Sequence, residues 1–417
     1  MSAPPTAAGP GRLVSRTRRV AGPVDPAAVA GADGLLFVEP SGRALAGRGV
    51  AFAGSPAAVE AALVAARVED EVERPGTGPI ALGALPFLPD GEATLVVPEL
   101  VVGRDADGTT WITTVVDAEA GGAAPDPGGI DLAEVVRPSP AVPGPGGFRV
   151  RSVRPPADWC DAVRSATGMI RAGRLDKVVL AREVEVEADS DLDLAAILRR
   201  LLLGFPGCFT YSLDGFVGAS PELLVGREGD EVRSQPMAGT APRRGDPLAD
   251  ADAVARLVDS PSYRHEHQVT IDAVYDALVP FCSYLDFEAE PSVVALPNVT
   301  HLATTVAGRL SAPPPGVLEL VAALHPTPAV CGRPAAVALE VIAELEGFDR
   351  GRYAGAAGWV DRHGNGTWCV AIRSAEIAGR RARVFAGNGI VADSDPATEL
   401  IETRAKLQAM LGVLVRP

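Results

Sequence analysis

The sequence predicts an α+β protein built on antiparallel sheets. Several apolar runs follow one another without a helix between them, as in residues 208–237 and 367–390, whereas a βαβ protein alternates strictly. Glycine (45 residues) and proline (37 residues) are spread along the chain and provide the turns. Hydrophobic residues make up 47% and charged residues 22% of the 417, which is typical of a chain with a buried core.

The first part of the chain is read from its turns and apolar runs. Residues 1–25 are rich in proline and lack periodicity, which predicts a disordered N-terminus. Residues 57–66 have a helical pattern and residues 121–147, rich in Gly and Pro, predict a long surface connection. Strands are predicted at 34–39, 49–53, 93–102 and 109–116.

After residue 150 strands and helices mix. Helices are predicted at 159–172, 192–203, 250–258, 266–278, 316–324, 334–346 and 396–413. Strands are predicted at 177–187, 208–218, 222–227, 231–237, 302–310, 367–378 and 381–390. The last two strands form a hairpin that turns at Gly379-Arg380, and the final helix carries proline in its first turn.

Charge and cysteine content exclude several classes of protein. With 38 basic and 53 acidic residues the formal charge is −15, which argues against general binding to nucleic acid or anionic membranes. The five cysteines form no CxxC pair, which indicates neither a disulfide framework nor a zinc site. Neither a secretory signal nor an apolar run of about 18 residues is present, so we expect a cytoplasmic protein.

Lysine is rare in this sequence. It occurs only at Lys177 and Lys406, while the other 36 basic residues are arginines. Arginine is not deprotonated in proteins, whereas a buried lysine can be. The two lysines are therefore candidates for work that a guanidinium cannot do; the alternative is chance survival at two surface sites.

Candidate reactive groups cluster on the last helix. Glu399 and Glu402 are spaced i, i+3, and Glu402 and Lys406 are spaced i, i+4, so all three share one face. The helix follows the segment FAGNGIV (385–391), whose Gly-x-Gly lets backbone N–H groups approach an anion. The alternative is a solvated helix with an ordinary ion pair.

Other polar residues adjoin apolar segments. In RHEH (264–267) the two histidines do not share a helix face, which excludes a zinc site of the HExxH type. Glu266 and Glu402, on two helices, suit Mg²⁺, which takes one or two carboxylates. Glu222 lies between apolar strands, where burial would raise its pKa and make it a general acid, or else it is a turn residue. Lys177 begins an apolar strand and, if buried, could act as a general base.

Histidines provide less information. His301 and His325 flank apolar segments, and each taken alone is more typical of a structural histidine.

Eight segments, in this order, resemble the chorismate-utilising enzymes and within them most closely the isochorismate synthases. They are DKVVLAR (176–182), GASPE (218–222), MAGTA (237–241), RHEH (264–267), THL (300–302), HPTPA (325–329), FAGNGIV (385–391) and ELIET (399–403). The resemblance covers about residues 155–415. It implies one large α+β fold with antiparallel sheets packed face to face and helices outside, in which 26–150 is a variable N-terminal portion and 151–417 the chorismate-binding catalytic portion.

The resemblance also implies a reaction, the magnesium-dependent conversion of chorismate to isochorismate without a redox cofactor. Lys177 would activate the water that adds at ring carbon 2, and Glu222 would protonate the hydroxyl that leaves carbon 4. Glu266 and Glu402 would bind Mg²⁺, with Glu399 as a further ligand or a group behind them. Two cations, Arg373 and Lys406, would hold the substrate carboxylates. The remaining substrate contacts would be Gly239, Thr240, His301, Ala329, Val330 and Gly389.

Subfamilies differ at a few of these positions. Lys177 stands where ammonia-using, anthranilate-type relatives carry glutamine, so we expect water as nucleophile, no glutaminase partner and a monomer. Salicylate-forming relatives share the lysine and also eliminate pyruvate. HPTPA matches the isochorismate pattern, but Val330 replaces a common leucine, and one methylene is worth only about 1–3 kcal/mol of discrimination. Ser262-Tyr263 replaces a lysine–acid pair, which affects the helix start more than catalysis.

Two further alternatives remain. In another class, the chain would be a non-catalytic chorismate-binding protein, against which stands the retention of Lys177, Glu222, Glu266 and Glu402. The product would feed siderophore (2,3-dihydroxybenzoate), salicylate or menaquinone synthesis, with residues 325–333 and 342–349 closest to the siderophore branch.

Overall fold

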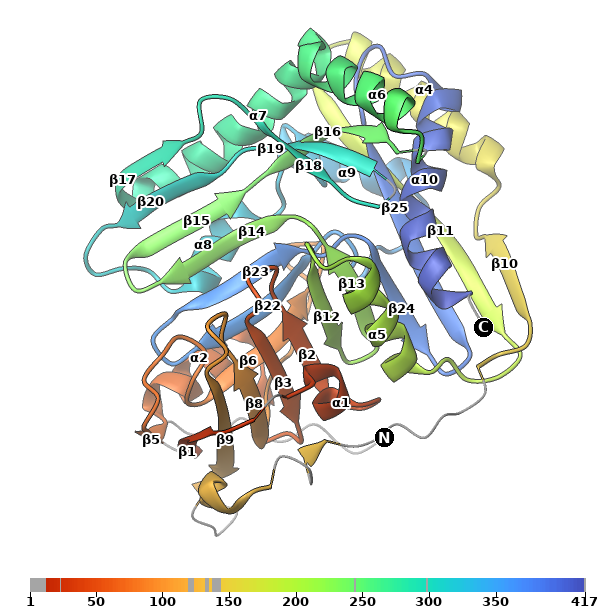
Figure 1. The fold of residues 1–417 in the computed structure, drawn as a ribbon. Helices are drawn as coiled ribbons and strands as arrows, with labels where there is room; N and C mark the ends of the chain where they lie inside the picture. The colour runs from red at the N-terminus through yellow and green to blue at the C-terminus, as the bar shows by residue number, and fades with distance from the viewer. Residues whose placement is uncertain are drawn as a thin grey trace.

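Two large sheets pack face to face, and helices cover their outer faces (Figure 1). The computed structural model describes residues 13–22, 24–118, 124–131, 135–136, 144–243, 245–297 and 299–415. Mixed helices and almost wholly antiparallel sheets confirm the predicted α+β class. The predicted surface connection at 121–147 lies largely outside the described residues.

The first sheet has 13 strands in the order β10-β11-β25-β24-β13-β12-β2-β3-β8-β9-β1-β5, with β21 paired to β11. Its only parallel pair among the described strands is β1 with β5. The strands are β1 Leu13–Val20, β2 Leu35–Val38, β3 Ala44–Arg48, β5 Arg67–Asp70, β8 Leu100–Arg104, β9 Thr110–Asp117, β10 Phe148–Ser152, β11 Lys177–Ala188, β12 Phe209–Leu213, β13 Phe216–Ser220, β21 Gly332–Arg333, β24 Ser374–Ala378 and β25 Arg381–Ile390.

A second sheet of nine strands has the order β17-β20-β15-β14-β23-β22-β6-β7-β4, and a third has the order β16-β19-β18. The strands of the second sheet are β4 Phe52–Gly54, β6 Ile80–Leu85, β7 Leu95–Val97, β14 Leu223–Glu228, β15 Glu231–Gln235, β17 Cys282–Phe287, β20 Val306–Leu310, β22 Ala356–Asp361 and β23 Gly366–Val370. Those of the third are β16 Met237–Pro242, β18 Ser292–Ala295 and β19 Val299–Ala303.

Several helices begin where the sequence offers a side-chain cap. Side chains of Ser55, Asp193, Asp246, Ser260 and Asp395 each accept a backbone N–H of the helix that follows. The helices are α1 Pro26–Ala30, α2 Pro56–Ala65, α4 Pro156–Arg171, α5 Leu194–Gly204, α6 Pro247–Asp259, α7 Pro261–Leu278, α8 Val317–Leu324, α9 Ala335–Leu345 and α10 Pro396–Leu414, with 3-10 turns η2 Pro127–Gly129 and η3 Val279–Phe281. No helix among the described residues has the length and apolarity needed to cross a membrane.

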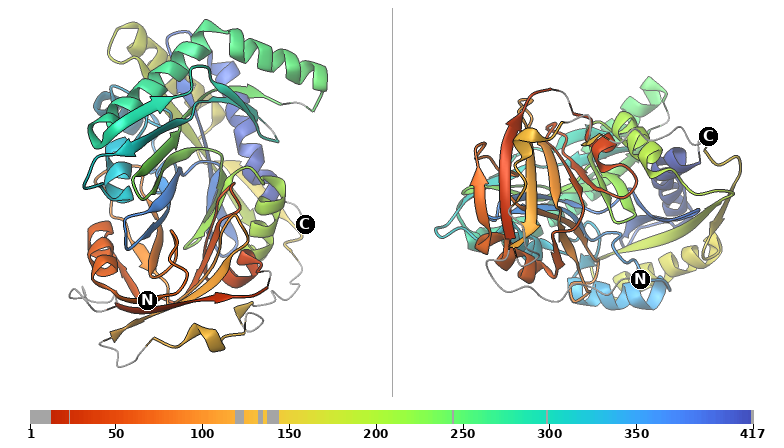
Figure 2. Two further views of the ribbon diagram at one scale, coloured as in Figure 1. Left: turned by 60° about the vertical axis from the view of Figure 1, so that its left-hand side comes forward. Right: turned by 90° about the horizontal axis from the view of Figure 1, so that it is seen from below.

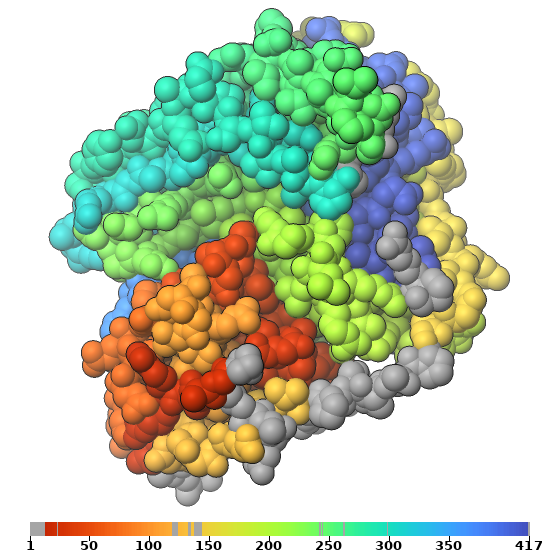
Figure 3. All heavy atoms as spheres, in the orientation of Figure 1, coloured from red at the N-terminus to blue at the C-terminus, as the bar shows by residue number. Residues whose placement is uncertain are grey.

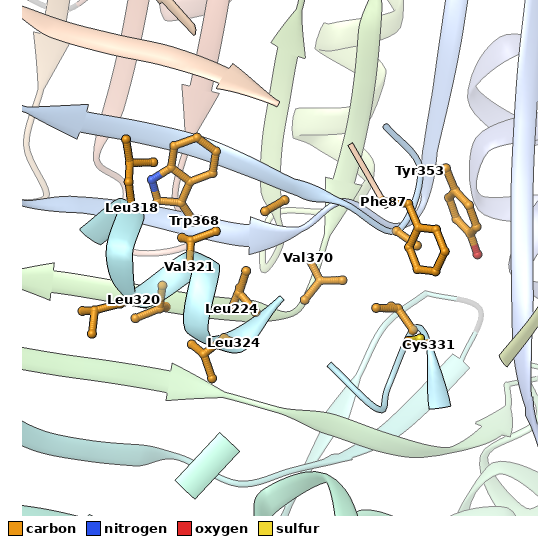
Figure 4. Packing of buried hydrophobic residues seen from close by; sticks show 14 of the residues in the cluster. Phe87, Leu224, Leu318, Leu320, Val321, Leu324, Cys331, Tyr353, Trp368 and Val370 are labelled. Atoms are coloured by element: carbon orange, nitrogen blue, oxygen red, sulfur yellow. The ribbon is translucent and has the colours of Figure 1, made fainter. Parts of the chain in front are cut away.

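The core occupies three layers. Between the large sheets lie Trp111, Tyr211, Phe216 and Trp359, all fully buried. Outside the first sheet, α1, α5 and α10 cover a second apolar layer, and the views in Figure 2 show these helices on one side of it. Outside the second sheet, α8 packs on β14 and β23 through Leu318 and related side chains (Figure 4).

The N-terminal portion shares both large sheets with the rest of the chain. Strand β2 pairs with β12, and β6 pairs with β22. In the space-filling view the red and orange atoms of the N-terminal portion lie directly against the yellow-green atoms of the later chain (Figure 3). Residues 26–150 are therefore hydrogen-bonded directly to the catalytic portion within both large sheets.

The prediction of disorder for residues 1–25 is wrong for part of that range. Residues 1–12 lie outside the described part, but Leu13–Val20 form β1, which pairs with β5 and β9. Leu13, Ser15 and Thr17 are buried, whereas the residues that alternate with them, Val14, Arg16 and Arg18, are partly exposed. Because two of the three buried positions are polar, the period-2 pattern was hidden.

Several segments predicted as one strand form two strands in the structure, because the chain turns or passes to another sheet between them. Residues 208–218 form the β12–β13 hairpin, turning at Asp214-Gly215, which both have positive φ. Residues 302–310 and 367–378 each contribute strands to two different sheets. Residues 93–102 divide at Pro98, and β3 was not predicted. The β24–β25 hairpin turning at Gly379-Arg380 is confirmed.

Candidate active site

One cavity of about 360 Å³ brings together every site residue predicted from the sequence. Its wall is built from strands of the first and third sheets, from helices α7 and α10 and from the loops between them. The predicted residues that line it are Lys177, Glu222, Gly239, Thr240, Glu266, His301, Ala329, Val330, Arg373, Gly389, Glu399, Glu402 and Lys406. Two of them stand at crossings between sheets, Glu222 after β13 and Arg373 before β24.

Lys177, the first residue of β11, is buried with 5% of its surface exposed. Its Nζ donates to Glu266 Oε1 on α7 at 2.7 Å. A Cβ at position 389 on β25 would lie 2.7 Å from Lys177 Cε and 2.9 Å from Glu266 Oε1. Glycine at 389 therefore leaves the space in which this ion pair forms.

Glu222 is buried, and from the described residues its carboxyl receives one long backbone hydrogen bond. Met237 N–H donates to its Oε1 at 3.4 Å. Removal from water raises the pKa of Glu222 to about 7, against the opposing effects of that hydrogen bond and of Arg373 and Lys177. Such a carboxyl can hold a proton near neutral pH and deliver it as a general acid.

Arg373 is buried and has a φ of +52°, an unusual conformation for a residue other than glycine. Its Nη2 donates to His301 Nε2 at 3.1 Å, while its Nε has no hydrogen-bond partner among the described residues. Burial and the adjacent Arg373 hold the pKa of His301 well below 6.5. The neutral ring then carries its proton on Nδ1, which lies 3.2 Å from Gly239 O.

This arrangement points to an anionic ligand. A buried guanidinium without a carboxylate partner pays a desolvation cost that a bound anion would offset. His301 cannot supply that charge because it is neutral. Arg373 therefore offers a donor for a carboxylate inside the cavity.

Helix α10 presents its polar face to the cavity, as its spacing predicts. Lys406 Nζ donates to Glu402 Oε1 at 2.7 Å, to Asn388 Oδ1 at 2.8 Å and to Gly387 O at 3.1 Å. These three acceptors use all three N–H bonds of the ammonium. Burial and the nearby Glu402 raise the pKa of Glu399, whose oxygens accept from Ser394 and Asn388.

The three predicted metal ligands do not form a closed cage. Among the described residues no three His, Cys, Asp or Glu side chains are grouped around a common metal position. Burial raises the pKa of the Tyr263 hydroxyl, and Glu402, Glu266 and Glu399 raise it further, so all three carboxylates lie near this side chain. Two carboxylates completed by substrate oxygens and water fit Mg²⁺, which rarely uses an all-protein cage.

Two tyrosines of the cavity wall were not predicted as site residues. Tyr263, expected to affect the helix start more than catalysis, lines the cavity beside Gly239. Tyr353 stacks on Phe385 with ring centroids 5.0 Å apart, and burial raises its pKa to about 12. The sequence signal for Tyr263 was its departure from the pattern of relatives, whereas nothing local distinguishes Tyr353.

Comparison with known proteins shows the family of this chain. A family model described as "Chorismate binding enzyme" matches residues 47–415. The chain belongs to this family. The chorismate-binding enzyme described here is 42% identical over 356 residues to a Mycobacterium tuberculosis protein named "Putative isochorismate synthase MenF", covering 82% of this chain and 88% of that one.

A second relative and a solved structure are also similar to this chain. Isochorismate synthase DhbC of Bacillus subtilis is 40% identical over 278 residues, 64% of this chain and 70% of that one. The solved structure of MenF, the menaquinone-specific isochorismate synthase from Escherichia coli, has a TM-score of 0.82 over 97% of this chain and 96% of that one. At 24% identity that structure shows the fold alone.

Proposed function

We propose that this chorismate-binding enzyme is an isochorismate synthase, an isomerase that converts chorismate to isochorismate. The observation that carries the proposal is the pairing, in one cavity, of a buried amine on Lys177 with a buried carboxyl of pKa about 7 on Glu222. A reaction that takes a proton from water and gives one to a departing hydroxyl needs such a pair. The names of the relatives support the same activity.

Lys177 and Glu222 would move one proton each. Lys177 Nζ, in its neutral form, takes a proton from the water whose oxygen bonds to ring carbon 2. The ring double bonds shift, and the bond from carbon 4 to its hydroxyl breaks. Glu222 gives its proton to that hydroxyl, which leaves as water. Water enters and water leaves, so substrate and product are isomers and no redox cofactor is needed.

Arg373 would bind a carboxylate of the substrate through its unpartnered Nε, with His301 fixing the guanidinium from the other side. Gly239, Thr240, Ala329, Val330 and Gly389 would complete the contacts. For Lys406 we revise the expected role. Its three N–H bonds are taken by Glu402 and β25, so it would hold Glu402 in place and leave the substrate carboxylates to Arg373.

Mg²⁺ would be held by Glu266 and Glu402, with Glu399 as a further ligand or a group behind them. Bound there, Mg²⁺ supplies positive charge for the substrate's ring carboxylate. We expect a cytoplasmic monomer without a glutaminase partner, because Lys177 stands where ammonia-using relatives carry glutamine. Its product would enter siderophore (2,3-dihydroxybenzoate), salicylate or menaquinone synthesis.

Product analysis tests the proposal. Purified protein is incubated with chorismate, with and without Mg²⁺, and the products are separated by chromatography and weighed by mass spectrometry. A magnesium-dependent product with the mass of chorismate and a different retention time is the expected result. Salicylate with pyruvate would make the chain a salicylate synthase, turnover only with ammonia an ammonia-using enzyme, and binding without turnover a non-catalytic chorismate-binding protein.

A further inference from the structure

A buried ion pair lies directly behind the cavity wall. Arg350 and Glu346 each have a side chain 2% exposed. Arg350 Nε donates to Glu346 Oε2 at 2.8 Å, and Nη2 donates to Oε1 at 2.5 Å. A buried pair of this kind is weak evidence for stability, since apolar residues of similar volume often serve as well. Its other contacts are therefore the informative ones.

The remaining donors of Arg350 join two segments that line the cavity. Nη1 donates to Val330 O and Nη2 to Val179 O, both at 2.8 Å. Val179 lies on β11, two residues after Lys177, and Val330 lies in the cavity wall. On the other side of the pair, Glu346 Oε1 accepts from Ala181 N–H at 2.7 Å.

The strand pairing shows why a guanidinium is needed at this point. Strand β21 pairs with β11 at Lys177 and Val178, and Val179 N–H donates to Cys331 O at 2.8 Å. Beyond that bond the two neighbouring segments present the carbonyl oxygens of Val179 and Val330 to each other. Both are acceptors, so they cannot form a hydrogen bond. Arg350 supplies a donor to each and so continues the connection that the ladder cannot make.

The N-terminal portion covers this group. The ring of Phe87 lies over the guanidinium, with its centroid 4.1 Å from Arg350 Cζ. Phe87 N–H donates to Gly351 O at 2.9 Å, and its carbonyl oxygen accepts from His325 Nε2 at 2.9 Å. Figure 4 shows Phe87 close to Tyr353 and Cys331. His325 is thus the structural histidine that the sequence predicts, at the start of the segment that ends in Val330.

We propose that Arg350, held by Glu346 and covered by Phe87, is a positioning residue that fixes the strand of Lys177 against the cavity wall at Val330. The proposal rests on the proposed isochorismate synthase activity. Arg350 touches neither substrate nor reacting atoms and acts through two backbone carbonyls. Because a general base must stand within hydrogen-bonding reach of the proton it removes, a shift of β11 against this wall lowers kcat more than it raises KM.

The test uses the full chain and two variants. Arg350→Lys keeps the charge, but one ammonium cannot reproduce the planar fork that binds Glu346 and both carbonyls. The double variant Glu346→Leu with Arg350→Met removes both charges, so no buried charge is left without a partner. It keeps the test possible if Arg350→Lys fails to fold. Arg352→Lys is the matched control. Arg352 also pairs with a carboxylate, Glu376, lies over Phe216 and donates to two carbonyls, but these belong to Leu213 and Asp214, which do not line the cavity.

We expect kcat to fall at least tenfold in both test variants, with the KM for chorismate changed less than threefold. Backbone amides of Val179 and Ala181 should exchange with solvent at least tenfold faster, measured by hydrogen exchange. Arg352→Lys should leave kcat and these amides unchanged. Unchanged kcat per folded molecule, or unchanged exchange at these amides, would overturn the proposal. If the wild-type protein fails to convert chorismate, the proposed function falls, while the exchange measurement still decides whether Arg350 holds β11.

Discussion

Replacing Glu222 with glutamine tests two properties of this carboxyl separately. One is the free-energy cost of ionising it in the folded protein, and the other is its proposed role as a proton donor. Burial raises its pKa from 4.5 to about 7, so ionisation is disfavoured in the folded protein. Because the folded-state pKa lies above the unfolded one, ionisation of Glu222 lowers the free energy of unfolding. This loss is absent at low pH, grows as the pH rises through 4.5 and levels off above 7. At 1.36 kcal/mol per pKa unit, the cost increases by about 2.5 kcal/mol between pH 5 and pH 8.

Glutamine has no proton to lose, so Glu222→Gln escapes this cost. The free energy of unfolding of the variant, relative to wild type, should therefore rise by about 2.5 kcal/mol between pH 5 and pH 8. The same substitution removes the proton donor for the departing hydroxyl. General acid catalysis contributes about 10²–10⁴-fold, so kcat should fall by that factor, or about 2.7–5.5 kcal/mol in activation free energy.

Urea unfolding at pH 5 and pH 8 measures the first effect, and isochorismate formation at pH 7 measures the second. Glu340→Gln, on the exposed face of α9 with 71% of its side chain accessible, is the control and should change neither. A stability difference that does not vary with pH would refute the raised pKa of Glu222. A kcat within threefold of wild type would refute its role as the acid.

Three further substitutions test the rest of the site. Lys177→Arg keeps a positive charge but cannot become neutral near pH 7, so kcat for isochorismate formation should fall by about 10²–10⁴-fold while the thermal unfolding midpoint stays close to wild type; near-normal turnover would exclude Lys177 as the base. Gly389→Ala puts a Cβ 2.7 Å from Lys177 Cε and must displace the Lys177–Glu266 pair, so kcat should fall more than tenfold, and an unchanged kcat would show that the pair is not needed. Glu402→Ala removes one proposed ligand and should raise the Mg²⁺ concentration for half-maximal activity at least tenfold, as measured by a magnesium titration of turnover; an unchanged titration would count against Glu402 as a ligand.

The sequence predicted local features best. The i, i+4 spacing of Glu402 and Lys406 gave their ion pair directly, because a helix fixes both positions. The pair of Lys177 and Glu266 joins residues 89 positions apart, and only the family resemblance brought both into one site. Spacing also gives no sign of burial: Glu346 and Arg350 have the spacing of an exposed helical pair, yet both are buried.

The main error in the predicted fold was to read one strand where the chain passes from one sheet to another. This matters for the site because Arg373 lies at such a crossing. Residues 367–378 read as one strand because apolar side chains continue through the segment. The chain instead leaves the second sheet after β23 and enters the first at β24, and Arg373 takes a positive φ just before that entry. Periodicity reports which residues are buried and not which sheet buries them, so a residue at such a crossing is hidden in a continuous pattern.

The two lysines show how far a composition argument reaches. Both are buried, at 5% and 8% exposure, which excludes chance survival on the surface. They are kept for different physical reasons. In the proposed reaction Lys177 is the amine that takes the proton from water, a role that arginine cannot fill. Lys406 gives its three N–H bonds to three acceptors around one nitrogen, and a planar guanidinium, whose donors spread over three nitrogens, would not fit these positions. Composition thus identified both residues, while only the surrounding acceptors distinguish a proton carrier from a structural cation.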